Sequence, residues 1–413
     1  MRIFKRIALL FLVLLVWTAF VGLGFMNGYL LRPITGDDSP QGFIAAVEEH
    51  LNTVYVGNVA LLMIEDGAVS ESFFYSADQP VTETSVFPVA SISKWVTSFG
   101  VMKLVEQGKL DLDAPVESYL TRWHLPESEF EHDKVTIRRL LSHSSGLVDD
   151  CGYAGFAADE PVQTLEESLT KAADGPDYAG EARVGYEPGS QYVYSGAAYT
   201  LLQLVMEEVS GLPFTDFMDQ EVLQPLGMEH STFDYSATSQ FSKALVYQVD
   251  GRIREPKRFT ALAAAGLYTC TADLGKFLLA NLSDPSVLNP STLQTMVTAE
   301  TFINQVGVYG LGPHLYSQND ANSQIIGHDG SGNNAINTAA RVDLMSRSGI
   351  IILETGHYDL ASSLADEWLF WKAGVYDFVV MTRNRSYLLT LLVSGYVVLL
   401  LGFGLVLVRS RKK

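Results

Sequence analysis

The hydrophobic pattern divides the chain into two long apolar runs at its ends and a mixed region between them. Residues 7–31 and 387–408 carry no charged side chain. Each run is long enough to cross a bilayer core of about 30 Å as a helix. We therefore expect two membrane-spanning helices around one folded domain at residues 42–375, with residues 33–41 as a linker.

Basic residues flank both apolar runs on the side of the chain terminus. Three lie within the first six positions, and residues 409–413 contain four. Because such flanks tend to stay in the cytoplasm, residues 1–32 are expected to be an N-terminal anchor, 386–408 a second span and 409–413 a cytoplasmic tail. Both termini would then be cytoplasmic, and the middle of the chain would lie outside. A cleaved signal peptide is the alternative for the first segment, although its apolar core is usually only about 7–15 residues long.

The middle of the chain has strand patterns at both ends and helical patterns between them. Alternating or continuously apolar runs predict strands, and these cover residues 54–64, 68–76, 306–315, 324–328, 334–343 and 349–354. Helical periodicity dominates about residues 130–255, and a final amphipathic helix covers residues 360–371. This order predicts an α+β domain that is interrupted by a mostly helical insertion.

One short stretch carries the strongest chemical signal. Ser91 follows an extended segment and opens a helix whose apolar residues recur at three- and four-residue steps until Gly108. Lys94 lies one turn later on the same face, where an amine in an apolar wall can take the proton of a serine hydroxyl. Ser-x-x-Lys is common by chance, and a second copy at Ser168 and Lys171 lies in a polar stretch typical of a solvated helix.

Charge and cysteine content narrow the range of partners. All 47 acidic residues lie between the two apolar runs, which argues against nucleic acid or an anionic lipid surface as a partner. Cys151 and Cys270 are the only cysteines, and the exported location would permit a disulfide whose geometry the sequence does not supply. No cluster of cysteine and histidine suggests a metal, and no Gly-x-Ser-x-Gly elbow suggests an α/β-hydrolase.

Several ordered blocks resemble the class C β-lactamase-related serine hydrolases, which include penicillin-binding DD-peptidases, D-aminopeptidases and carboxylesterases. The resemblance extends over about residues 42–373. The matching blocks are FPVASISK at 87–94, GKLDLD at 108–113, VTIRRLLSHSSGL at 135–147, EPGS at 187–190, YSG at 194–196, PLGM at 225–228, AGLY at 265–268 and GHDG at 327–330. It implies a five-stranded antiparallel sheet flanked by helices, a mostly helical second region and a site between them.

The resemblance also implies roles for individual residues. Ser91 would be the acylated nucleophile, Lys94 would take or share its proton, and Tyr194 would act as general base and acid. The backbone N–H groups of Ser91 and Ser331 would form the oxyanion hole. The expected substrate-binding and oxyanion residues are His328, Gly330, Ser331 and Gly196.

Two positions depart from the family pattern. Gly196 stands where the family usually has an Asn that contacts the substrate amide. His328 replaces a fixed cation by a group with a reference pKa of about 6.5, so that binding of a substrate carboxylate would be weaker or pH-dependent. Both departures favour an esterase or a relaxed amidase. His143 is expected to be structural, and residues 148–185 to form a long loop of the kind that is often functional beside a site.

Together these features predict a membrane-anchored extracytoplasmic serine hydrolase that forms an acyl-enzyme with an ester or amide. Its expected partners are a small-molecule or peptide acyl substrate and the membrane, with no cofactor and no metal. A penicillin- or cell-wall-fragment-binding protein that deacylates slowly, or a pseudoenzyme, is the main alternative. A membrane assembly protein that merely reuses the scaffold is a third possibility, and the oligomeric state stays open.

Overall fold

The chain forms two compact units. The computed structural model describes residues 2–54, 57–148, 153–175, 180–282, 287–320, 323–332 and 335–411. The larger unit is Val47–Ala365, and the smaller unit combines Met1–Ala46 with Asp366–Lys413.

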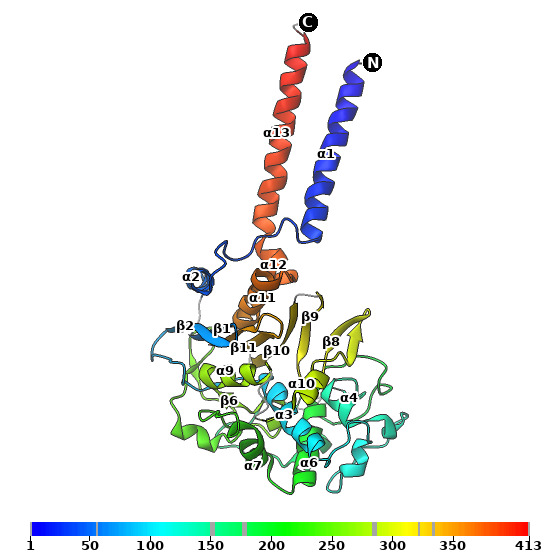
Figure 1. Ribbon diagram of the computed structural model, residues 1–413, viewed down its shortest axis with the longest axis vertical. Coiled ribbons are helices and arrows are strands. Elements are labelled where there is room, and N and C mark those ends of the chain that lie inside the picture. Colours follow the sequence, from blue (N-terminus) through cyan, green and yellow to red (C-terminus); the bar gives the residue numbers. More distant parts are fainter. Residues whose placement is uncertain are drawn as a thin grey trace. The chain divides into compact units, whose positions relative to one another are not determined.

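An antiparallel sheet of eight strands forms the framework of the larger unit within the described residues (Figure 1). Its order is β2-β1-β12-β11-β10-β9-β8-β7. The strands are β1 (Asn58–Glu65), β2 (Ala68–Ser76), β7 (Thr301–Ile303), β8 (Val306–Tyr309), β9 (His314–Asp320), β10 (Ser323–Gly332), β11 (Ile336–Asp343) and β12 (Ser348–Thr355). The first hairpin and the β11–β12 pair therefore lie where the apolar runs predicted strands, and every neighbouring pair is antiparallel.

The expectation of five strands is wrong, because three more strands extend the sheet beyond β10. The pattern at residues 306–315 predicted one strand, but a turn at 310–313 divides it into β8 and β9. In that turn Gly310 N–H donates to the Pro313 carbonyl, and Gly312 has a φ of +118°, which disfavours other residues. β7 contains only three residues, too few for a periodic signal.

Helices fill the region between the first hairpin and the later strands. They are α3 (Ile92–Glu106), α4 (Ile137–Leu141), α5 (Leu165–Lys171), α6 (Gly196–Ser210), α7 (Phe214–Met218), α8 (Leu262–Ala265), α9 (Thr271–Ala280) and α10 (Pro290–Met296). Two short strand pairs accompany them: β3 (Phe87–Pro88) with β6 (Tyr268–Thr269), and β4 (Val246–Tyr247) with β5 (Ile253–Arg254). These helices are joined by long irregular segments, and the whole arrangement is α+β as predicted.

Helix α3 is the centre of the larger unit. Residues 92–102 are all buried, because α3 packs against α6 and α8 and also against β10 and β11. Its aromatic residues contact α9, where Phe277 lies with its ring 5.0 Å from that of Trp95 and 4.8 Å from that of Phe99. The helix ends before Gly108, whose φ of +68° suits glycine, as the sequence predicted. Neighbouring elements therefore cover the first three turns of this helix, as its largely apolar sequence predicted.

The smaller unit contains α1 (Arg2–Met26), most of α2 (Pro40–Leu51), α12 (Phe378–Arg383) and α13 (Arg385–Arg411). The helix α11 (Leu360–Ala373) spans the boundary between the units. Phe4–Met26 and Arg385–Arg409 are long and apolar enough to cross a membrane, a property that a signal sequence near the N-terminus shares. The two helices contact one another, since Trp17 Nε1 donates to the Leu392 carbonyl at 3.1 Å.

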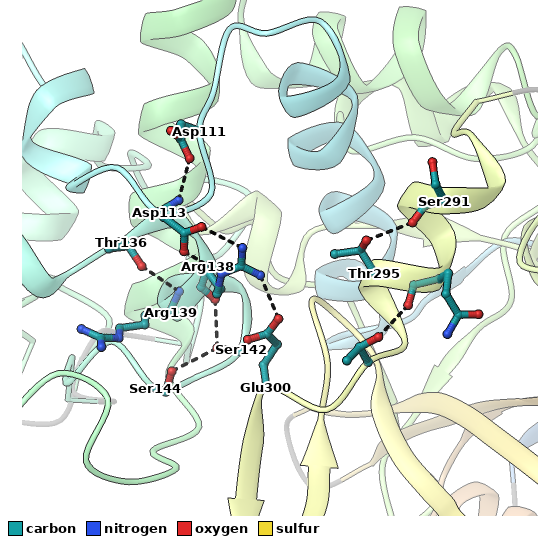
Figure 2. A network of polar contacts seen from close by, with 12 residues as sticks. Asp111, Asp113, Thr136, Arg138, Arg139, Ser142, Ser144, Ser291, Thr295 and Glu300 are labelled. Atoms are coloured by element: carbon teal, nitrogen blue, oxygen red, sulfur yellow. Dashed lines mark hydrogen bonds and ion pairs between the residues drawn. The ribbon is translucent and has the colours of Figure 1, made fainter.

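Arg138 on α4 ties the helical region to the segment that leads into β7 (Figure 2). Its Nε and Nη2 donate to Asp113 at 2.7 and 2.9 Å, and its Nη1 donates to Glu300 at 2.8 Å. Its backbone N–H donates to the Leu112 carbonyl. The hydrogen bond from Arg138 lowers the pKa of the Asp113 carboxyl. One guanidinium group therefore joins three segments that are far apart along the chain.

Arg138→Met is expected to lower the free energy of unfolding by about 1–2 kcal/mol, because it removes the cation between two carboxylates. The measurement is denaturant unfolding of the full chain in detergent micelles. Arg252→Met is the matched control: it removes an exposed Arg–Asp pair with Asp250, for which a change below about 0.5 kcal/mol is expected. Equal losses in both variants would contradict the role given to Arg138.

Candidate active site

Ser91 lies at the N-terminal end of α3, directly after a strained turn. Ala90 has a φ of +46°, a conformation that residues with a side chain seldom adopt. Ser93 holds this turn, because its Oγ donates to the Ala90 carbonyl at 2.5 Å and accepts from Leu267 N–H at 2.9 Å. The turn leaves Ser91 half-buried at the start of the helix.

Lys94 is buried beside Ser91, one helical turn further on. Its side chain is 2% exposed, and its Nζ donates to Ser91 Oγ at 3.1 Å and to the Ala264 carbonyl on α8 at 2.8 Å. Gln203 on α6 supports α8, because its Oε1 accepts from Ala263 N–H at 3.0 Å. The Lys94 amine is thus held between the Ser91 hydroxyl and the Ala264 carbonyl. The helix α8, which carries this carbonyl, is in turn held by α6.

Tyr194 lines the same cavity as Ser91 and Lys94. The Nζ of Lys94 lies 5.0 Å from the centre of the Tyr194 ring. The cavity has a volume of about 170 Å³, and the residues around it are Pro88, Ala90, Ser91, Lys94, Tyr153, Tyr194, Gly196, Phe259, Ala265, Ser331, Gly332 and Ile336. The structure therefore brings the predicted hydroxyl, amine and phenol together in one cleft.

His143 positions the backbone around Tyr194. It is fully buried with a φ of +56°, and its carbonyl accepts from Val193 N–H at 2.9 Å. Its Nδ1 accepts from Ser195 N–H at 3.0 Å, and its ring lies 4.3 Å from the Tyr194 ring. Both neighbours of Tyr194 are therefore held by one residue. The placement agrees with the structural role that the sequence suggested.

The predicted substrate-binding residues His328, Gly330 and Ser331 lie on β10, but only part of this strand lines the cavity. Ser331 and Gly332 line the cavity. Gly330 is buried, and a Cβ there would come within 2.1 Å of the Val89 carbonyl oxygen, so that glycine permits the close approach of β10 to the Ser91 turn. Thr338, which faces Gly330 across the strand pair, donates through Oγ1 to the same carbonyl at 3.0 Å.

His328 is not among the residues around the cavity. Its Nδ1 pairs with the Asp329 carbonyl at 2.6 Å and its Nε2 with the Tyr309 hydroxyl at 3.1 Å. Burial, with smaller contributions from His314 and Lys94, keeps the pKa of His328 well below its usual value. The ring is therefore neutral, and it packs with its centre 6.2 Å from that of Tyr194 rather than opening onto the cleft.

Gly196 lies at the start of α6 and lines the cavity. The side chain that fills the space beside it belongs to Tyr153, a residue that the sequence did not identify. A Cβ on Gly196 would lie 1.6 Å from the Tyr153 hydroxyl oxygen. Sequence reasoning also missed Ser93 and Gln203, which act through hydrogen bonds between distant segments. Tyr153 lies in the long loop expected at residues 148–185, but no local pattern singles out this residue within the loop.

One group among the described residues has the spacing of a metal site outside the cleft: His230, Cys270 and Asp273. It does not fit a cation well, because Lys276 Nζ donates to Asp273 Oδ1 at 3.0 Å and the backbone N–H of His230 donates to Oδ2 at 2.6 Å. Burial also raises the pKa of the Cys270 thiol to about 12. The disulfide considered with Cys151 cannot be placed, since Cys151 falls outside the described residues.

Acidification is expected to destabilise the fold through His314, which packs beside His328 and Tyr194. Burial lowers the pKa of His314 to about 4. The neutral ring is thus favoured in the folded state, so the stabilisation is complete above about pH 6.5 and is lost as the pH falls toward 4. Between pH 7 and pH 4, His314→Gln should lose about 2 kcal/mol less than the parent chain in unfolding experiments. Identical losses in both proteins would contradict this.

Comparison with known proteins gives the family. The family model described as Beta-lactamase matches residues 43–373. Protein flp of Staphylococcus aureus (strain MW2) is 22% identical over 307 residues, covering 71% of this chain and 59% of that protein. Penicillin-binding protein 4* of Bacillus subtilis (strain 168) is 30% identical over 188 residues, which are 44% of this chain and 39% of that protein. The chain thus spans less than two thirds of the length of these curated relatives.

Solved structures agree with this result. The octameric penicillin-binding protein homologue from Pyrococcus abyssi has a TM-score of 0.68 at 27% identity, over 81% of this chain and 77% of that one. A class C beta-lactamase mutant has a TM-score of 0.63 at 18% identity, over 79% and 95%. The second likeness concerns the fold alone. The family model matches most of the chain, and the fold brings the serine and the lysine together in a single cleft. This protein therefore belongs to the beta-lactamase family.

Proposed function

We propose that this protein is a membrane-anchored serine hydrolase that acts outside the cytoplasm on an ester or amide through an acyl-enzyme. The observation that carries the proposal is the 3.1 Å contact between Lys94 Nζ and Ser91 Oγ, in a cleft that Tyr194 also lines. A serine hydroxyl becomes an effective nucleophile when a base is within hydrogen-bond reach. Ser91 is half-buried and lines this cavity.

In the first step Ser91 Oγ attacks the substrate carbonyl carbon, and its proton passes to the Lys94–Tyr194 pair. The pair then returns the proton to the leaving oxygen or nitrogen as the bond to the carbonyl carbon breaks. In the second step water attacks the acyl-serine ester and gives up a proton to the same pair. That proton returns to Ser91 Oγ as the acid product leaves, so that the enzyme is restored.

The oxyanion is assigned to the backbone N–H groups of Ser91 and Ser331. Ser91 stands at the N-terminal end of α3, a helix of 15 residues, where the peptide dipoles favour negative charge. Ser331 lies on β10 and lines the same cavity. Loss of one such donor typically costs about a hundred- to a thousand-fold in rate.

The lining of the cavity supports an uncharged substrate group more than a carboxylate. Lys94 is the only basic side chain among the described residues around the cavity, and its amine already has Ser91 and Ala264 as partners. His328 is neutral and faces Tyr309. Much of the remaining wall is apolar, as in Pro88, Phe259 and Ile336. These features favour an ester or a neutral amide.

Contacts within the smaller unit support retention of the N-terminal segment as an anchor. Thr18 Oγ1 and the Tyr396 hydroxyl lie 2.5 Å apart, between the two helices long enough to span a membrane. After the first helix, Arg32 N–H donates to Asn384 Oδ1 at 2.9 Å. Cleavage near residue 31 would remove the partner of the second helix along its length.

A penicillin- or cell-wall-fragment-binding protein that deacylates slowly is the second candidate. It is favoured by the name of the Bacillus subtilis relative, Penicillin-binding protein 4*. The same nucleophile would be acylated, but the acyl-serine would persist. Stoichiometric labelling by a fluorescent penicillin without turnover would support it, whereas rapid multiple turnover of an ester would exclude it.

Ser91→Ala is expected to reduce turnover of a chromogenic ester by at least about a thousand-fold, with unchanged thermal unfolding, because the nucleophile is lost. The same variant should also lose covalent labelling by a serine-reactive phosphonate. Ser168→Ala, in the second Ser-x-x-Lys copy on α5, is the matched control and should keep both activities. Wild-type turnover in Ser91→Ala would exclude the proposed hydrolase.

The N-terminal segment is expected to remain in the mature protein. Intact-mass measurement of chain purified from membranes should give the mass of a species that includes residues 4–26. A chain truncated before residue 386 should still resist carbonate extraction, because the first helix alone anchors it. A mature N-terminus between residues 20 and 40, with release of the truncated chain, would indicate a signal peptide instead.

A further inference from the structure

Gly196 and Tyr153 share one small volume in the wall of the cleft. Both line the cavity that contains Ser91. A Cβ at position 196 would lie 1.6 Å from the Tyr153 hydroxyl oxygen and 2.1 Å from the adjacent ring carbon Cζ. Two heavy atoms cannot approach so closely, so any side chain on residue 196 excludes Tyr153 from its place. The space that a side chain on residue 196 would take is thus occupied by a residue from another part of the chain.

The backbone that carries Tyr153 is held at several points. The N–H of Gly155 donates to Asp174 Oδ2 at 2.9 Å. Phe156 and Arg258 exchange two backbone hydrogen bonds, at 2.8 and 2.9 Å. Tyr153 also packs against the hydrophobic core. These contacts place the ring in the wall as part of the folded structure.

The segment that holds the backbone around Tyr153 also carries a second residue of the cavity wall. Arg258, which pairs with Phe156, precedes Phe259, and Phe259 lines the cavity. Gly155 packs against the same segment, since a Cβ there would lie 2.7 Å from the Phe259 ring. Tyr153 and Phe259 therefore belong to one continuous wall, whose two halves come from segments about a hundred residues apart.

We infer that Tyr153 determines the substrate specificity of the cleft: its ring occupies the space left by Gly196 and limits the cavity to a small, uncharged substrate group. The inference rests on the proposed hydrolase function and names its substrate class. The cavity of about 170 Å³ is similar in size to an engineered apolar cavity of about 150 Å³ that holds benzene. Groups of up to about six carbon atoms fit such a volume, which points to short-chain esters.

The first experiment measures how Tyr153 affects the choice between short and long groups. For the full chain in detergent, kcat/KM is determined for p-nitrophenyl acetate, butyrate and octanoate, and for acetate esters of short and long alcohols. Tyr153→Ala should raise the ratio of kcat/KM for the octanoate to kcat/KM for the acetate at least about tenfold, or the same ratio of long to short alcohols among the acetate esters. Tyr153→Phe keeps the ring and should shift the ratio less than threefold. Tyr186→Ala, which changes an exposed tyrosine between α5 and α6 that is not among the residues around the cavity, is the matched control.

The second experiment tests the coupling between the two positions. Gly196→Ala should lower the melting temperature and reduce kcat/KM for the acetate ester at least about tenfold, because the new methyl group displaces Tyr153. In the double variant Gly196→Ala/Tyr153→Ala the methyl group has room. Both the melting temperature and kcat/KM should therefore recover above the values of Gly196→Ala alone, a non-additive result that independent sites do not give.

The outcomes separate this inference from the proposed function. Turnover that persists in Ser91→Ala would overturn the hydrolase itself. If turnover depends on Ser91 but Tyr153→Ala leaves the long-to-short kcat/KM ratio unchanged in both ester series, the role of Tyr153 alone is overturned. Strictly additive effects in the double variant would overturn it as well. If Tyr153→Ala does not melt cooperatively, Tyr153→Leu replaces it. If no ester turns over, the relative rates at which ethyl and octyl fluorophosphonates label Ser91 give the same ratio without deacylation.

Discussion

The burial of one amine organises the active-site region of this protein. Lys94 lies on a helix that is covered on all sides, and a buried amine is costly unless its N–H groups have acceptors. Ser91 Oγ and the Ala264 carbonyl are two such acceptors, from two different elements. α3 must therefore pack closely against α8, and this packing sets the position of the serine oxygen. The proposed chemistry and the stability of the core depend on the same contacts.

The environment behind the cleft is neutral although it is rich in histidine. His143, His314 and His328 surround Tyr194 together with other aromatic rings. Burial lowers the pKa of each imidazole, and the positive charge of Lys94 contributes to this in all three. The three imidazoles are therefore neutral, and among the described residues around the cavity Lys94 is the basic side chain beside the proposed nucleophile. A positively charged histidine in the place of His328 would have suited a substrate carboxylate better than the neutral ring does.

Local patterns predicted much of the fold and the first part of the site. The first hairpin, the strands β11 and β12, α3 and its end at Gly108 all follow from periodicity and glycine placement. Ser91 and Lys94 could be paired because one helical turn brings them together. Tyr194 was found only through the family resemblance, and its catalytic role stays a prediction. The strand β7 is too short to give a periodic signal, and the division of β8 from β9 depends on the turn at 310–313, where Gly312 has a positive φ.

The sequence by itself determined most of the helices and strands, the two apolar ends and the one-turn pairing of serine with lysine, because these depend on neighbours along the chain. Only the tertiary structure decided which distant groups meet in the cleft. His328 lies near Gly330 in sequence, yet pairing with Tyr309 turns it away from the cavity. Tyr153 carries no local signal, and it reaches the site because Gly196, on another segment, has no side chain to exclude it. Such complementarity depends on the packing of segments far apart in the chain, and no periodicity encodes it.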